Sequence, residues 1–254
     1  MGRMFVSELL KVRRNKSLKK ACVLYGALIL LCAINTGGEQ NLGYSGIRAL
    51  FMAPCYQAPW SYWIFAAFSV LLLGGEYDGR LLKNAFACGI GRGKYYAVKV
   101  ISVYFACFLL FISSIVLITF IRTARFGFNP DGLIIEDYRL KVLVFNGMAL
   151  AVIFAYVSLF NLLCIVFRSS GLPFILGVAV TFLDAVSTLL SDKYYGSLME
   201  YPKNLFSIIQ VMRNEIKSVD ILKPDFLGMY IPCLCVGGVS LLAGYVLFKV
   251  RDVE

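Results

Sequence analysis

The segment 89–94 holds the residue types best suited to binding a phosphate. It reads Gly-Ile-Gly-Arg-Gly-Lys, so glycines could bring the backbone close to an anion and the lysine could pair with it. A Walker A loop also needs a glycine five residues before its Gly-Lys pair and a hydroxyl directly after it. Cys88 and Tyr95 occupy those positions, and no predicted strand precedes the segment. The glycines therefore favour tight turns, and we expect this chain to bind no nucleotide or other cofactor.

The other reactive residue types also argue against an enzyme. The sequence contains no histidine, which excludes Ser-His and Cys-His catalysis and most zinc sites. None of the eight cysteines forms a C-x-x-C pair, and most lie within apolar stretches, where a thiol behaves as a small apolar side chain. Only Cys55 and Cys88 fall in predicted loops. We expect no catalytic residue, no metal site and no enzymatic activity of the chain itself.

The composition indicates an integral membrane protein. Of the 254 residues, 59% are hydrophobic and only 16% are charged, and the mean hydropathy is +0.76. A helix needs about 20 mostly apolar residues to cross the hydrocarbon core. Alternation of apolar and polar residues, as in a membrane barrel, is absent. The sequence predicts an all-α protein with a single domain over residues 1–254 and six transmembrane helices, at 17–35, 60–75, 98–121, 142–167, 171–190 and 226–248.

The distribution of Lys and Arg predicts the orientation of these helices. With the N-terminus inside, the inner segments hold 15 basic and five acidic residues, a net charge of +10. The outer segments hold ten basic and nine acidic residues, a net charge of +1. Because cytoplasmic loops are enriched in Lys and Arg, both termini are expected in the cytoplasm of a multi-pass cell membrane protein. The basic surface then faces anionic lipid, and nucleic acid is not needed to explain it.

The N-terminal residues 1–16 have the pattern of an amphipathic helix lying at the membrane interface. Phe5, Leu9 and Val12 share one face, and Arg13 and Arg14 add basic charge near its end. A frayed polar tail is the alternative. A cleaved signal peptide is disfavoured, because the basic region is long and residues 32–35 form a poor cleavage site.

Three features are compatible with an aqueous path or a gate. Asp184 is the only acidic residue within a predicted span, with Thr181 on the same helical face, and a carboxylate in lipid should face a bundle interior or an aqueous path. Asn161 is a further polar residue of a predicted span, and it either lines that path or hydrogen-bonds a neighbouring helix. The large external loop 191–225 carries an apolar helical stripe, which is either a gate or an ordinary loop helix.

The loop 76–97 carries the most specific pattern in the chain. It contains Glu-Tyr-Asp-Gly-Arg-Leu-Leu-Lys at 76–83, then Gly-Ile-Gly-Arg at 89–92, Lys-Tyr-Tyr at 94–96 and Lys99. This run resembles the E-Y-x-x-G-T-x-K and G-I-S-R-x-x-Y signature of type 2 ABC transporter permeases, in particular small bacterial six-span subunits. Arg80 departs from that signature and Gly91 stands where Ser is usual, and both lie at turn positions.

The resemblance implies a short cytoplasmic coupling helix within 76–97 that docks on a separate ATPase, beside the interfacial helix. We expect Leu81, Leu82 and Phe86 to form an apolar docking face. Glu76 is expected either to pair with Arg13, Arg14 or Lys16 and transmit motion, or to be a solvated surface charge. The coupling residues carried over are Glu76, Tyr77, Gly79, Leu81, Leu82, Lys83, Phe86, Gly89 and Arg92.

The resulting hypothesis is the permease subunit of an ATP-driven exporter of antimicrobial, bacteriocin-like or other amphipathic peptides. Two copies of an ABC ATPase would supply ATP and Mg²⁺ chemistry, and a second permease half would be another copy or a relative of this chain. An ion-coupled secondary transporter would use Asp184 but would be expected to show further intramembrane charges and internal repeats, and neither is seen in the sequence. A non-transporting membrane scaffold or sensor subunit would share the predicted topology.

Overall fold

The computed structural model of the chain describes residues 2–34, 46–47, 49–50, 60–78, 81–87, 89–128, 138–177, 179 and 225–250. All regular secondary structure within these ranges is helical. The predicted span 171–190 is helical over 171–177, and the rest of it lies almost wholly outside the described residues, as does the loop 191–225 apart from residue 225. The elements, in chain order, are α1 (Gly2–Arg14), α2 (Lys16–Ile34), α4 (Trp60–Ser69), the π-helix η1 (Val70–Gly74), α5 (Gly75–Asp78), α6 (Leu81–Ala87), α7 (Arg92–Phe126), α8 (Tyr138–Phe167) and α12 (Asp225–Val250).

Three helical segments in the described ranges are long and apolar enough to cross a membrane. They are Arg92–Phe126, Val142–Phe167 and Cys233–Val250. The first, helix α7, has 35 residues and is therefore about 52 Å long, more than the roughly 30 Å of a hydrocarbon core. It ends at Gly127, whose φ of 80° is a conformation that glycine adopts readily. A shorter apolar helical segment covers Ile64–Tyr77.

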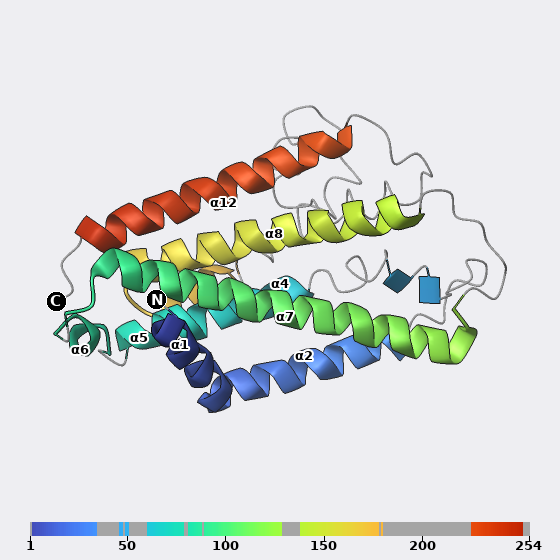
Figure 1. Cartoon of the computed structure of the whole chain (residues 1–254), viewed down its shortest axis with the longest axis horizontal. Helices are drawn as coiled ribbons and strands as arrows, with labels where there is room; N and C mark the ends of the chain where they lie inside the picture. Colours follow the sequence, from blue (N-terminus) through green and yellow to red (C-terminus); the bar gives the residue numbers. More distant parts are fainter. Residues whose placement is uncertain are drawn as a thin grey trace.

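The N-terminal helix is separated from α2 by a single non-helical residue, Asn15. The side-chain oxygen of Asn15 accepts hydrogen bonds from the backbone N–H groups of Ser17, at 2.9 Å, and Leu18, at 3.4 Å. These groups have no partner within α2, so Asn15 serves as the N-cap of that helix. The break between α1 and α2 is therefore encoded locally, and it lets α1 take its own direction across the bundle (Figure 1).

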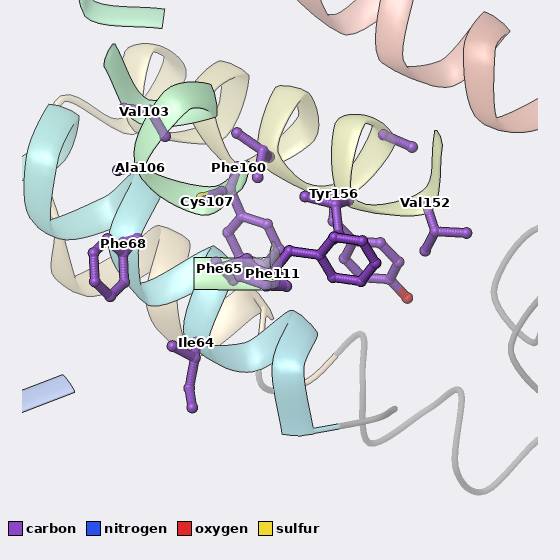
Figure 2. Close-up of a cluster of buried hydrophobic side chains, with 14 of the residues drawn as sticks. Ile64, Phe65, Phe68, Val103, Ala106, Cys107, Phe111, Val152, Tyr156 and Phe160 are labelled. Atoms are coloured by element: carbon purple, nitrogen blue, oxygen red, sulfur yellow. The ribbon is translucent and has the colours of Figure 1, made fainter. Parts of the chain in front are cut away.

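The core lies between α4, α7 and α8. Ile64, Phe65 and Phe68 of α4 are buried in one cluster with side chains of the two long helices, and Figure 2 shows Phe65 on the side of α4 that faces them, whereas Ile64 points away. All the labelled side chains of the two long helices are buried. Helix α7 contributes Val103, Ala106, Cys107 and Phe111, and helix α8 contributes Val152, Tyr156 and Phe160. In α7 these residues fall at 103, 106–107 and 111, and in α8 they are four residues apart, which is the spacing of one helical face. The opposite faces leave apolar residues exposed, among them Phe108, Ile112 and Val116 of α7.

The second predicted span, 60–75, is not one uniform α-helix. Its α-helical part ends at Ser69, a π-turn covers Val70–Gly74, and a short α-helix continues to Asp78. A π-turn accommodates an additional residue and changes the angular position of everything that follows it. Gly74 also lies against the chain after α8: a Cβ there would stand 2.9 Å from Ser170 Cα and 3.1 Å from the carbonyl oxygen of Ser169. The turn therefore fixes both the depth and the rotation of α5.

Segments from distant parts of the sequence gather toward one end of the bundle. The start of α1, the short helices α5 and α6, and the last turns of α12 all lie toward the same end (Figure 1). There the Arg92 guanidinium donates a hydrogen bond of 3.3 Å to the backbone oxygen of Lys249. This end brings together the N-terminal helix and the 76–97 loop identified in the sequence.

Candidate functional site

Four charged side chains meet where α1, α5 and α7 converge. Lys99 Nζ of α7 lies 2.5 Å from Glu76 Oε1 of α5 and also pairs with Glu8 Oε2 of α1. Lys11 Nζ lies 2.6 Å from Glu8 Oε1 and 3.3 Å from Glu76 Oε1. The side chain of Lys99 is 3% exposed, those of Glu8 and Glu76 are 7% and 6% exposed, and Lys11 is half-exposed at 51%. We call these four residues the ion cluster.

Tyr95 completes the coordination of Glu76. Its buried phenol O–H donates a hydrogen bond to Glu76 Oε2, while Oε1 receives the two ammonium groups. Tyr95 and Lys99 are four residues apart and therefore share one face of α7. Both oxygens of the Glu76 carboxylate are thus occupied, as an ionised carboxylate buried away from water requires.

The short spacing within each helix explains how the ion cluster forms. Glu8 and Lys11 are three residues apart on α1, so their side chains reach each other on the helix surface. Glu76 follows directly on the π-turn and Gly75, which set the direction in which its side chain leaves α5. Lys99 is supplied by the first turns of the longest helix. The contacts of Lys99 with Glu8 and Glu76 therefore connect α7 to α1 and α5.

Electrostatics hold Lys11 in its charged form. Partial burial alone would lower the pKa of the Lys11 ammonium, but its hydrogen bond to Glu8 and the charges of Glu76 and Glu8 outweigh that effect. The net result is a pKa above the ordinary value for lysine. Lys11 therefore carries its positive charge in the ion cluster at neutral pH.

Glu76 is in the ion cluster, but its partners differ from those expected. The sequence interpretation paired it with Arg13, Arg14 or Lys16, whereas the structure pairs it with Lys11 and Lys99. Arg13 and Arg14 are exposed. The alternative of a solvated surface charge is wrong for Glu76, because the whole residue is only 5% exposed.

The predicted apolar docking face is also wrong for Leu82. This side chain is 1% exposed and belongs to the core of the chain itself. Phe86 is half-buried, with its ring 5.6 Å from that of Tyr95 and 6.0 Å from that of Phe248 on α12. The apolar side of α6 therefore packs inward, because it covers the ends of α7 and α12. Leu81 and Lys83 are within α6, and Gly79 lies outside the described residues.

Two other predicted coupling residues shape the turn between α6 and α7. Gly89 has a φ of 79°, a conformation that supports the glycine expected at this turn. Arg92 begins α7, and its guanidinium lies 5.9 Å from the centre of the Phe86 ring, within cation–π range. Tyr77, the remaining described residue of this set, is partly buried against the core.

The N-terminal helix docks through the face predicted from its sequence. The rings of Phe5 and Phe105 of α7 meet edge to face at 5.7 Å, Leu9 is half-buried, and Val12 packs against the core. Glu8 lies on this same face and was not singled out in the sequence. Its position between Phe5 and Val12 was the available signal, since a carboxylate on an apolar face requires a buried partner.

Of the three residues predicted for a translocation path, the structure describes only Asn161. Asp184 and Thr181 lie outside the described residues. Asn161 is 1% exposed on α8, and its amide nitrogen and oxygen have no hydrogen-bond partner among the residues that the structure describes. Ser158, one turn earlier, bonds across to Tyr104 of α7 at 2.5 Å, as expected for a polar contact between membrane helices.

No set of three His, Cys, Asp or Glu side chains within the described ranges is arranged to hold a metal ion. No protein-family model and no curated protein matches this chain.

Proposed function

We propose that this chain is the permease subunit of an ATP-driven ABC exporter, with six transmembrane helices and both termini in the cytoplasm. The observation that supports this proposal most directly is the ion cluster, because it connects the 76–97 loop to a membrane-length helix. A chain without a nucleotide site needs a place where a partner's movement enters it. The segment that resembles a coupling loop is held at Glu76 by α1 and α7.

The second end of the loop also contacts the long helices. Phe86 of α6 contacts the rings of Tyr95 and Phe248, and Arg92 bonds to the backbone of Lys249. The loop is thus joined to α7 and to α12, two helices with membrane-length apolar segments. Packed side chains of this kind carry displacement from one element to the next, because a close-packed interior is not easily compressed.

The inward burial of Leu82 changes the surface proposed for docking. Among the loop residues whose side-chain exposure the structure describes, the exposed positions are at the turn between α6 and α7: Ala87, Gly89, Gly91 and Lys94. We place the ATPase contact on this turn. A push there reaches Phe86 and Arg92 directly, and through them α7 and α12.

The substrate in this proposal is an amphipathic or antimicrobial peptide that is moved out of a bacterial cell. The ATPase, in two copies, supplies ATP and Mg²⁺, and a second permease half, either the same chain or a relative, completes the transporter. The large apolar surfaces that α7 and α12 leave exposed suit a lipid bilayer and a partner permease.

Coexpression with the ABC ATPase proposed as its partner tests the proposal. The two subunits should copurify, and inverted membrane vesicles should take up labelled amphipathic peptide only with ATP. Lys94→Glu should lower copurification at least about tenfold, because it reverses a charge on the proposed contact. Lys19→Glu, an equivalent change at an exposed residue of α2, should have no effect. Failure of the two subunits to copurify would contradict the proposal. If Lys94→Glu assembles with the ATPase as well as wild type does, the proposed docking surface is wrong.

A further inference from the structure

Helix α1 buries a charged side chain as well as apolar side chains against the bundle. Its Glu8 is 5% exposed, whereas two of its large apolar residues, Val6 and Leu10, are 55% and 44% exposed. The Phe5 ring contacts Phe105 at 5.7 Å, but Phe105 itself is 40% exposed. Apart from Met4 and Val12, which pack against the core, the attachment of α1 to the bundle therefore depends on the ion cluster.

The four charges of the ion cluster divide into two neutral pairs. Glu8 and Lys11 both belong to α1 and are 2.6 Å apart. Glu76 and Lys99 belong to α5 and α7 and are 2.5 Å apart. The contacts of Lys99 with Glu8, and of Lys11 with Glu76, are the ones that cross between α1 and the bundle. Breaking both crossing contacts leaves each side with its own ion pair.

This division removes the usual penalty for separating a buried ion pair. Removing one partner of such a pair is strongly destabilising because an uncompensated charge remains buried. Here the bundle keeps Lys99 paired with Glu76, and Glu76 keeps the hydrogen bond from Tyr95. Glu8 and Lys11 move into water together, where the desolvation cost of Glu8 is recovered.

A hinge for this movement is present at Asn15. It is the one non-helical residue within the described segment 2–34. Its side chain caps α2 through Ser17 and Leu18, and those hydrogen bonds do not involve α1. Helix α2 therefore keeps its N-terminal cap when α1 changes direction.

We propose that α1 is a releasable clamp, which docks and undocks as a unit about Asn15 while the charges of the ion cluster separate into the pairs Glu8–Lys11 and Glu76–Lys99. Lys99 is the positioning residue, because it holds Glu8 in the docked state and Glu76 in both states. Undocking uncovers Lys99, Glu76 and Tyr95, which lie on α5 and the first turns of α7. The inference does not depend on the chain being an exporter.

Amide hydrogen exchange of the full chain in lipid nanodiscs tests the clamp. In the wild type, amides of residues 2–14 should exchange at least about 100-fold faster than those of 64–76 and 92–102, as expected for a separately opening unit. Glu8→Gln should speed exchange in 2–14 a further tenfold or so and leave the bundle within about twofold of wild type. Equal rates in α1 and the bundle, or a common rise in both, would show that α1 is an inseparable part of the core.

Lys99→Met provides the second test, because it removes the cation that serves both states. Exchange should then rise at least about tenfold both in 2–14 and in 70–78, since Glu76 loses its permanent partner. Lys19→Met, the same change at an exposed lysine of α2, should alter neither segment. A rise confined to 2–14 would mean that Glu76 does not need Lys99, and the two-pair division would be wrong.

Discussion

The energetic importance of Glu76 depends on its buried position directly after the π-turn. A carboxylate at the end of an apolar helix is a common surface feature, and one exposed pair to a lysine contributes little. Here Glu76 receives Lys11, Lys99 and the Tyr95 phenol while being 5% exposed. With so little water available, each of these groups replaces solvent, and loss of one has a cost that a surface pair would not show.

Glu76→Gln should therefore destabilise the chain strongly. Breaking a buried ion pair from one side costs about 3–5 kcal/mol, and the value should lie near 3 because Lys99 keeps Glu8. For a chain of this size that corresponds to a fall in apparent Tm of about 6–12 °C in detergent, measured by intrinsic fluorescence at a fixed heating rate. Tyr95→Phe removes only one hydrogen bond and should cost about 1.5–3 kcal/mol. A loss below about 1 kcal/mol for Glu76→Gln would instead indicate a solvated pair.

The importance of Glu76 was predictable from the sequence, but its partners were not. The 76–83 pattern drew attention to this residue, and charge alone offered Arg13, Arg14 and Lys16 as neighbours. The choice of Lys11 and Lys99 depends on the crossing of α1 over α7, which no local pattern encodes. The same limit applies to Leu82, since an apolar side of a short helix can face the chain's own core or a partner.

Helix positions were more predictable than contacts, because long apolar runs have sharp polar ends. The predicted helix 17–35 lies within one residue of α2 (Lys16–Ile34) at each end. The predicted helix 226–248 lies within two residues of α12 (Asp225–Val250) at each end. The helix predicted at 98–121 was too short, because α7 extends from Arg92 to Phe126. Helical hydrogen bonding continues through polar residues until a glycine stops it at residue 127, so hydropathy alone underestimates the length.

The π-turn gives a test at the level of one element. Gly74→Ala places a Cβ 2.9 Å from the backbone of Ser170, which cannot rotate away, so we expect a loss of about 1–3 kcal/mol. Gly75→Ala has nothing within 4 Å of the new Cβ and a helical φ of −60°. It should be neutral or should stabilise the chain by about 0.4–1 kcal/mol. Apparent Tm values in detergent compare the two, and equal values would mean that η1 does not pack against the segment after α8.

At the scale of the whole molecule, charge and architecture point to the same end of the bundle. The Lys11, Lys99 and Arg92 side chains belong to α1 and α7 near the loop, and Lys249 ends α12 beside them. This is also the end at which α1 begins and α6 lies (Figure 1). The positive-inside rule therefore predicts that this end faces the cytoplasm, which is the orientation we propose.

Labelling of two cysteines in intact cells tests that orientation directly. The net charges of +10 and +1 on the two sets of loops predict that Cys55 is outside and Cys88 inside. A membrane-impermeant maleimide should therefore modify Cys55 in intact cells, and Cys88 only after permeabilisation. Cys55→Ala and Cys88→Ala variants assign each signal, and Cys107 and Cys164 should stay unreactive because both are fully buried in the core. Modification of Cys88 in intact cells would reverse the topology and place the 76–97 loop on the wrong side for a cytoplasmic ATPase.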